Sequence, residues 1–182
     1  MNFFSILMGL EDNDDLHLGR LLILLSVFAG RNGHGSINGL TKLAKLDFLL
    51  RYPVYMERAL KARGASPSDM EVADYERKSV ESSMVRFHYG PWDFRYRRFI
   101  NLLVAKGLAQ IDIKGRTIYI NITDAGLDLA KLLSRTEQFQ DIAKRSRLLK
   151  RHFNLSSTNL MKFIYRTFPE ISTLRLGEVI EP

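Results

Sequence analysis

The residue types that usually carry out chemistry are few in this chain and lie far apart in the sequence. Among its 182 residues there is no cysteine, which rules out thiol nucleophiles, zinc thiolates and disulfides. None of the four histidines shows the spacing of a metal site, such as two histidines four residues apart. They are His17, His34, His88 and His152. With no catalytic serine–histidine–aspartate order or carboxylate pair either, we expect no enzyme, no metal and no cofactor.

One glycine-rich stretch has a faint likeness to a phosphate-binding loop. Residues 30–35 read Gly-Arg-Asn-Gly-His-Gly. A phosphate-binding loop follows a strand and contains Gly-Lys followed by Ser or Thr, and this stretch has neither feature. We therefore predict a turn at these residues and no nucleotide site.

Binding is the alternative to catalysis, and the net charge of +7 suits nucleic acid, an anionic surface or an acidic partner. A predicted helix over residues 94–106 and the hairpin after it carry basic side chains that could contact phosphates or guanine edges. The candidate DNA-contact residues are Arg95, Arg98, Asn101, Lys114 and Arg116. The same face could instead dock a protein or simply be solvated.

Two further stretches are candidates for protein docking. Residues 89–93 read Tyr-Gly-Pro-Trp-Asp and contain the only tryptophan, a residue enriched at interface hot spots, although it could equally fill the edge of the core. A basic run over residues 144–151 could bind an acidic partner, and its alternative is a solvated helix face. The docking candidates are Tyr89, Trp92, Tyr96, Lys144, Arg147 and Arg151.

Hydrophobic periodicity and turn residues predict the elements that position these side chains. Helices are expected over residues 14–29, 41–52, 53–64, 94–106, 123–132, 137–152 and 157–168. Strands are expected over residues 84–89, 108–113 and 116–122, the last two joined by a turn at Lys114–Gly115. Asp14 or Asp15, Asp93 and Thr123 are the expected helix caps. A loop with one short helical turn is expected over residues 65–79.

The helix over residues 41–52 has an apolar stripe made by Leu43, Leu46 and Leu50. Its lysines fall outside this stripe, so we expect them on a different face. Asp47 and Arg51 lie four residues apart and are expected to form a weak ion pair at the surface.

Three helices, a hairpin and a further helix follow the order of a winged helix. We therefore predict a mainly α (α+β) fold: a winged-helix domain with a β-hairpin wing, a helical and loop insertion, and C-terminal helices. The domain would span residues 1–134 with the insertion at about 53–93, and residues 135–182 would form a helical extension packed on it.

Several motifs resemble one protein family across nearly the whole chain. They are Gly-Leu-Thr-Lys-Leu-Ala-Lys-Leu-Asp-Phe-Leu-Leu-Arg-Tyr-Pro at residues 39–53, Val-Glu-Ser-Ser-Met-Val-Arg at 80–86, Tyr-Gly-Pro-Trp-Asp at 89–93 with Arg95 and Tyr96, and Ile164 and Tyr165 with Phe-Pro-Glu at 168–170. The chain is similar to the middle component of the ABC-three-component systems, and within that family to the small subunit of the Lamassu anti-phage defence system.

The resemblance implies a cytoplasmic, non-catalytic adaptor that links an SMC-like ATPase to an effector, often a nuclease, somewhat as kleisin-type subunits dock on SMC proteins. Direct DNA contact would be nonspecific and made within the complex, and no catalytic residue carries over. The alternative is a stand-alone, dimeric winged-helix transcription regulator, and a third possibility is a DNA-processing enzyme with an unrecognised site. The apolar run over residues 21–29 is too short to span a membrane, so no membrane contact is expected.

Overall fold

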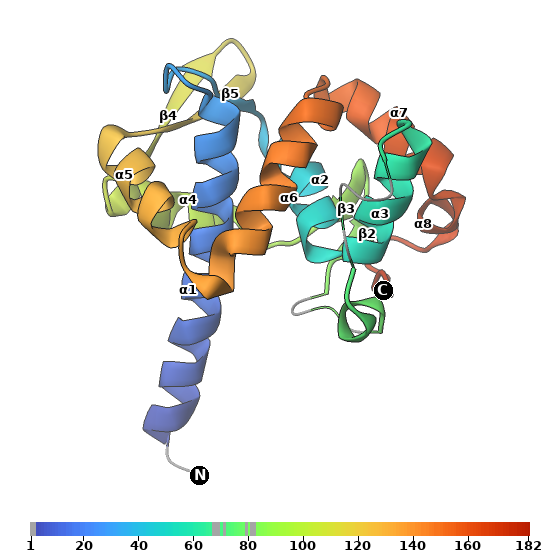
Figure 1. The fold of residues 1–182 in the computed structure, drawn as a ribbon, viewed down its shortest axis with the longest axis horizontal. Coiled ribbons are helices and arrows are strands. Elements are labelled where there is room, and N and C mark those ends of the chain that lie inside the picture. Colours follow the sequence, from blue (N-terminus) through green and yellow to red (C-terminus); the bar gives the residue numbers. More distant parts are fainter. Residues whose placement is uncertain (1–2, 67–69, 71, 79, 81–82) are drawn as a thin grey trace. The chain divides into compact units, whose positions relative to one another are not determined.

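The structure, a computed structural model of the chain, describes residues 3–66, 70, 72–78, 80 and 83–182, with side chains of the first helix from Asp14 onward. The fold is mainly helical with small antiparallel sheets, an α+β fold as predicted (Figure 1). The chain forms two compact units of two segments each. The first unit contains Met1–Ile37 and Arg95–Lys144, and the second contains Asn38–Phe94 and Arg145–Pro182. This division does not follow the predicted boundary between residues 134 and 135.

The first unit combines helices with a three-stranded sheet. Its helices are α1 (Phe3–Ala29), α4 (Tyr96–Ala105), α5 (Asp124–Leu133) and the beginning of α6 (Glu137–Phe153). The strand order is β1-β5-β4, with β1 at Ile37–Asn38, β4 at Ala109–Lys114 and β5 at Thr117–Ile122. The predicted hairpin is therefore confirmed, but Lys114 pairs with Thr117, so the turn is Gly115–Arg116. Gly115 has a φ of 61°, which a two-residue hairpin turn requires at this position.

The core of the first unit is largely the one that the periodicity predicts. On α4 the apolar stripe of Tyr96, Phe99, Ile100 and Leu103 is buried. Thr123 caps α5 as expected, because its Oγ1 accepts a hydrogen bond from the Gly126 amide at 3.1 Å.

Two of the predicted helix caps are wrong. α1 begins at Phe3, so Asp14 and Asp15 lie inside the helix and cap nothing. Nothing in residues 3–13 breaks a helix as proline would, so the helix continues toward the N-terminus. Asp93 does not cap α4 either, since the N-cap position is Arg95 and the Asp93 carboxylate binds an arginine of α2.

The second unit is built around α2, and its helices are α2 (Leu40–Arg51), α3 (Pro53–Ala62), the remainder of α6, α7 (Ser157–Thr167) and α8 (Pro169–Thr173). A short 3-10 helix, η2 (Asp74–Arg77), lies within the predicted loop and provides its expected helical turn. Four aromatic rings at the core of the unit pack with centroids 4.8–6.3 Å apart. They belong to Phe48, Tyr52, Tyr55 and Phe168.

The predicted amphipathic character of α2 is wrong. Every residue from Lys42 to Arg51 is buried. The ion pair of Asp47 and Arg51 is therefore a buried pair, with Nη1 and Oδ2 3.5 Å apart, and it does not lie on the surface. Apolar residues between the Leu stripe positions, such as Phe48 and Leu49, leave α2 with no continuous polar face.

A second hairpin lies beside α2 (Figure 1). β2 (Val85–Phe87) pairs antiparallel with β3 (Gly90–Trp92), so Gly90–Pro91 begins a strand where we predicted only a break. On the other side of β2 lies the C-terminal segment, where the Ile180 amide donates to the Met84 carbonyl at 2.9 Å. Pro91 therefore lies on β3, the edge strand of this sheet. A proline has no N–H to donate, and at an edge strand this breaks no hydrogen bond between strands.

Candidate functional site

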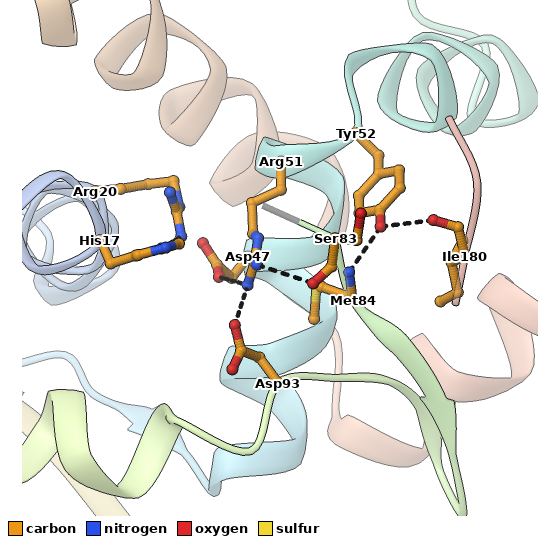
Figure 2. A network of polar contacts seen from close by, with 9 residues as sticks. All are labelled: His17, Arg20, Asp47, Arg51, Tyr52, Ser83, Met84, Asp93 and Ile180. Carbon is orange, nitrogen blue, oxygen red and sulfur yellow. Dashed lines mark hydrogen bonds and ion pairs between the residues drawn. The ribbon is translucent and has the colours of Figure 1, made fainter. Parts of the chain in front are cut away.

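The β2–β3 hairpin is fastened to α2 by one buried arginine. Arg51 Nη1 donates to Asp93 Oδ2 at 2.9 Å, directly after β3, and Nη2 donates to the Ser83 carbonyl at 3.4 Å, just before β2. Asp47 supplies a second carboxylate to the same guanidinium. Figure 2 shows the arginine between these groups. Both ends of the hairpin are therefore held to one helix by charge-assisted hydrogen bonds.

Tyr52, the residue after Arg51, adds a second attachment. Its hydroxyl accepts a hydrogen bond from the Met84 amide at 2.8 Å and donates to the Ile180 carbonyl at 2.8 Å (Figure 2). One side chain thereby joins α2, the start of β2 and the C-terminal segment. These contacts hold the base of the hairpin against α2 and the C-terminal segment.

The tip of the hairpin and the residue after β3 expose aromatic rings. Tyr89 is 62% exposed and Phe94 is 65% exposed. Phe87 lies among them, with its ring 5.3 Å from Phe94 in an edge-to-face arrangement and 6.3 Å from Trp92 in a stacked one. These contacts fix the orientations of the Phe87, Trp92 and Phe94 rings before any partner binds. We call Phe87, Tyr89, Trp92 and Phe94 the hairpin aromatic surface.

An apolar pocket of about 170 Å³ opens between α2 and this hairpin. Thr41 and Lys45 of α2 contribute to its wall, and the residues of the hairpin complete it. They are Phe87, Tyr89, Gly90, Pro91 and Trp92. Gly90 has a φ of 120°, which residues with a side chain rarely adopt, and a Cβ built there would lie 3.7 Å from Lys45 Cε. The hairpin tip therefore lies directly against the lysine.

Lys45 is only 1% exposed. Its Nζ donates to the Thr41 carbonyl at 3.0 Å and to Ser157 Oγ of α7 at 3.4 Å. Burial lowers the pKa of this amine from 10.5 to about 8. In the described part of the chain its contacts are with neutral oxygens, and no carboxylate forms an ion pair with it.

The structure separates the predicted docking residues into three places. Tyr89 and Trp92 lie together on the β2–β3 hairpin, the first exposed and the second half-buried. Tyr96 is fully buried on α4, so it is a core residue and offers no docking surface. Lys144, Arg147 and Arg151 are exposed on α6 at spacings of three and four, which puts them on one helix face.

The predicted DNA-contact residues all fall in the first unit. Asn101, Lys114 and Arg116 are exposed. Arg98 forms an ion pair with Asp14 of α1, which occupies its guanidinium. Arg95 is half-buried, with its guanidinium carbon 5.3 Å from the centre of the Phe99 ring. Lys114 Nζ lies 5.2 Å from the centre of the Tyr119 ring. Three of the five candidates therefore already contact another side chain of the protein.

Sequence reasoning missed the buried polar residues of α2, namely Lys45 and the Asp47–Arg51 pair, as functional candidates. The available signal was the density of apolar residues in this helix. From Leu43 to Leu50 the apolar side chains occupy every face, so the charged residues among them had no solvent-facing side to occupy.

Within the described residues no group of three or more His, Asp or Glu side chains is placed to hold a metal ion. No described helix is both long and apolar enough to cross a membrane. Comparison with protein-family models, curated proteins and solved structures found no match for this chain.

Proposed function

We propose that this protein is a non-catalytic, cytoplasmic adaptor that bridges an SMC-like ATPase and an effector, such as a nuclease, in a bacterial anti-phage defence complex. The observation that carries the proposal is the hairpin aromatic surface, which is exposed at its tip and fastened at its base. The motif at residues 89–93, one of those that resemble the defence family, forms the centre of this surface.

The physical reason is that aromatic side chains supply most of the binding energy at protein interfaces when they are held rigidly. Tyr89 and Phe94 are exposed, and the Arg51 contacts order the backbone of the hairpin that carries them. The packing of Phe94 on Phe87 also lowers the entropic cost of ordering the Phe94 ring on binding. Contiguous exposed apolar patches on soluble proteins mark sites of interaction with other molecules.

A winged-helix fold for the first unit belongs to the same proposal. In the first unit α1 and α4 precede the β4–β5 hairpin and α5 follows it, whereas α2, the predicted second helix, belongs to the second unit. The feature that supports the proposal is the short strand β1, which pairs with β5 and completes a three-stranded sheet. Winged helices serve both as protein-docking modules and as DNA-binding modules, so this feature is compatible with an adaptor.

Co-purification tests the proposal. The tagged protein would be expressed with the neighbouring open reading frames, and the eluate analysed by mass. We expect a stable complex with a large coiled-coil ATPase. Tyr89→Ala should weaken its affinity by on the order of 30-fold, the effect of losing about 2 kcal/mol at a hot spot.

Tyr75→Ala is the matched control, because Tyr75 is 76% exposed in the same unit but belongs to η2 and not to the hairpin. It should leave the affinity unchanged within twofold. Equal losses from both variants would show that the hairpin has no special part in binding, and a protein that elutes without any partner would refute the adaptor.

The exposed residues Asn101, Lys114 and Arg116 favour a second candidate, a dimeric winged-helix transcription regulator. A regulator should protect a palindromic DNA site without other proteins, with half-sites about one helical turn apart. An adaptor should bind DNA only nonspecifically and with steep salt dependence. Footprinting of the isolated protein at physiological salt distinguishes the two.

A further inference from the structure

Lys45 is a buried positive charge that costs stability in the isolated chain. Lysines are almost never fully buried unless they are paired, because removal of an ammonium from water is unfavourable. Here the ammonium contacts only the Thr41 carbonyl and the Ser157 hydroxyl among the described residues. An ammonium has three donor protons, so these two contacts leave one donor for another acceptor.

The pocket beside this lysine has the size and chemistry for one apolar side chain. Its volume of about 170 Å³ is smaller than the roughly 300–1,000 Å³ of pockets that hold small molecules. Its wall contains aromatic rings and proline on one side and the Lys45 stem on the other. A side chain seated there would lie against the Lys45 stem and bring its own neighbouring residues to the mouth of the pocket.

We propose that this pocket receives an acidic segment of the partner protein, with one apolar side chain inserted between α2 and the hairpin and an adjacent Asp or Glu carboxylate paired with Lys45. This inference rests on the proposed adaptor function and names the chemistry of the partner. The charge of the chain, +7, is complementary to such a segment.

A comparison with the neighbouring lysine of α2 makes the assignment specific. Lys42 is also buried, and burial lowers its pKa, but its Nζ donates to Asn154 Oδ1 at 3.3 Å and the pocket wall does not include it. Lys45 is the lysine whose stem lies against Gly90 at the hairpin tip. A carboxylate at the pocket therefore meets Lys45 before Lys42.

The pairing predicts a dependence of affinity on pH. Free Lys45 has a pKa of about 8, and a bound carboxylate would raise it, so binding takes up a proton above pH 8. The affinity should fall about tenfold per pH unit between the free and bound pKa values. Other titratable groups on the elements around the pocket are Lys42 on α2 and His88 and Tyr89 on the hairpin, while Ser157 of α7 does not titrate in this range.

The test uses the full chain and the co-purified ATPase as the probe. A carbodiimide joins an amine to a carboxylate only when the two are in contact, so we expect it to link Lys45 to an Asp or Glu of the ATPase. Lys45→Met, which keeps the length of the side chain, should weaken binding at pH 7 at least about tenfold and remove the pH dependence above pH 8. Lys42→Met is the control and should change the affinity less than about twofold.

Three outcomes are distinguishable. The cross-link, the loss in Lys45→Met and the intact control together support the inference. A complex that forms normally with Lys45→Met, or with no Lys45 cross-link, overturns the inference and leaves the adaptor function standing. A wild-type chain that recovers no ATPase overturns the adaptor function, and the inference falls with it. Urea unfolding of each variant confirms that it is folded.

Discussion

Removal of one hydroxyl group, in Tyr52→Phe, tests whether the base of the hairpin is held as the structure indicates. The hydroxyl joins the Met84 amide and the Ile180 carbonyl, both at 2.8 Å, and the Tyr52 side chain is fully buried. The phenylalanine ring would keep the aromatic contacts with Phe48 and Tyr55, whose centroids lie 4.8 and 5.7 Å away. The substitution therefore removes two hydrogen bonds and almost nothing else.

The expected cost follows from these contacts. Each intramolecular hydrogen bond contributes about 1 kcal/mol net, so Tyr52→Phe should lower the free energy of unfolding by about 2 kcal/mol. With a urea dependence of about 2 kcal/mol per molar, the midpoint should fall by roughly 1 M. Trp92 is the only tryptophan and lies on β3, so its fluorescence reports the unfolding of the second unit specifically.

Tyr55→Phe is the matched control. Tyr55 belongs to the same aromatic cluster and is 7% exposed, but its hydroxyl forms no hydrogen bond within the described residues. It should shift the urea midpoint by less than about 0.25 M, the equivalent of a change under 0.5 kcal/mol. If both variants shift the midpoint equally, the two hydrogen bonds of Tyr52 do not hold the hairpin and the C-terminal segment, and the account of a fastened hairpin is wrong.

Replacement of two buried cations of α2 should change the free energy of unfolding in opposite directions. Lys45→Met should raise the free energy of unfolding by about 2 kcal/mol at pH 7, because the pKa of Lys45 is lowered and the unfolded chain binds its proton more strongly. The stability of the wild type should therefore rise between pH 8 and 10.5 until the difference disappears, as urea titrations across this range would reveal. Arg51→Met should instead destabilise the protein by about 3–5 kcal/mol, because it leaves the Asp47 and Asp93 carboxylates buried without this partner; a change below 1 kcal/mol in calorimetry would contradict that. In the first unit, Thr123→Ala should cost about 1 kcal/mol through loss of the α5 cap, measured by circular dichroism, with Thr117→Ala on the exposed end of β5 as the reference.

The parts of this protein that short stretches of sequence could predict are those in which local chemistry dominates. The Thr123 cap, the α4 stripe and the hairpin over residues 109–122 each depend on residues within a few positions of one another. A capping hydroxyl, an i, i+3, i+4 period and a glycine in a two-residue turn have nearly the same consequence in any fold. The predicted positions of these elements were accurate to within a residue or two for that reason.

The candidate site depends on contacts that no local pattern contains. Arg51 meets Asp93, 42 residues away, and Lys45 meets Ser157, 112 residues away. The sequence near each residue predicted solvent for both, because a charged side chain next to a leucine stripe usually lies on the exposed face of a helix. Helix α2 is instead covered by the hairpin and by α7, so the same charges became a fastening pair and a buried lysine at the wall of a pocket. Burial is decided by what packs against a helix, and that is a property of the assembled chain and not of the helix sequence.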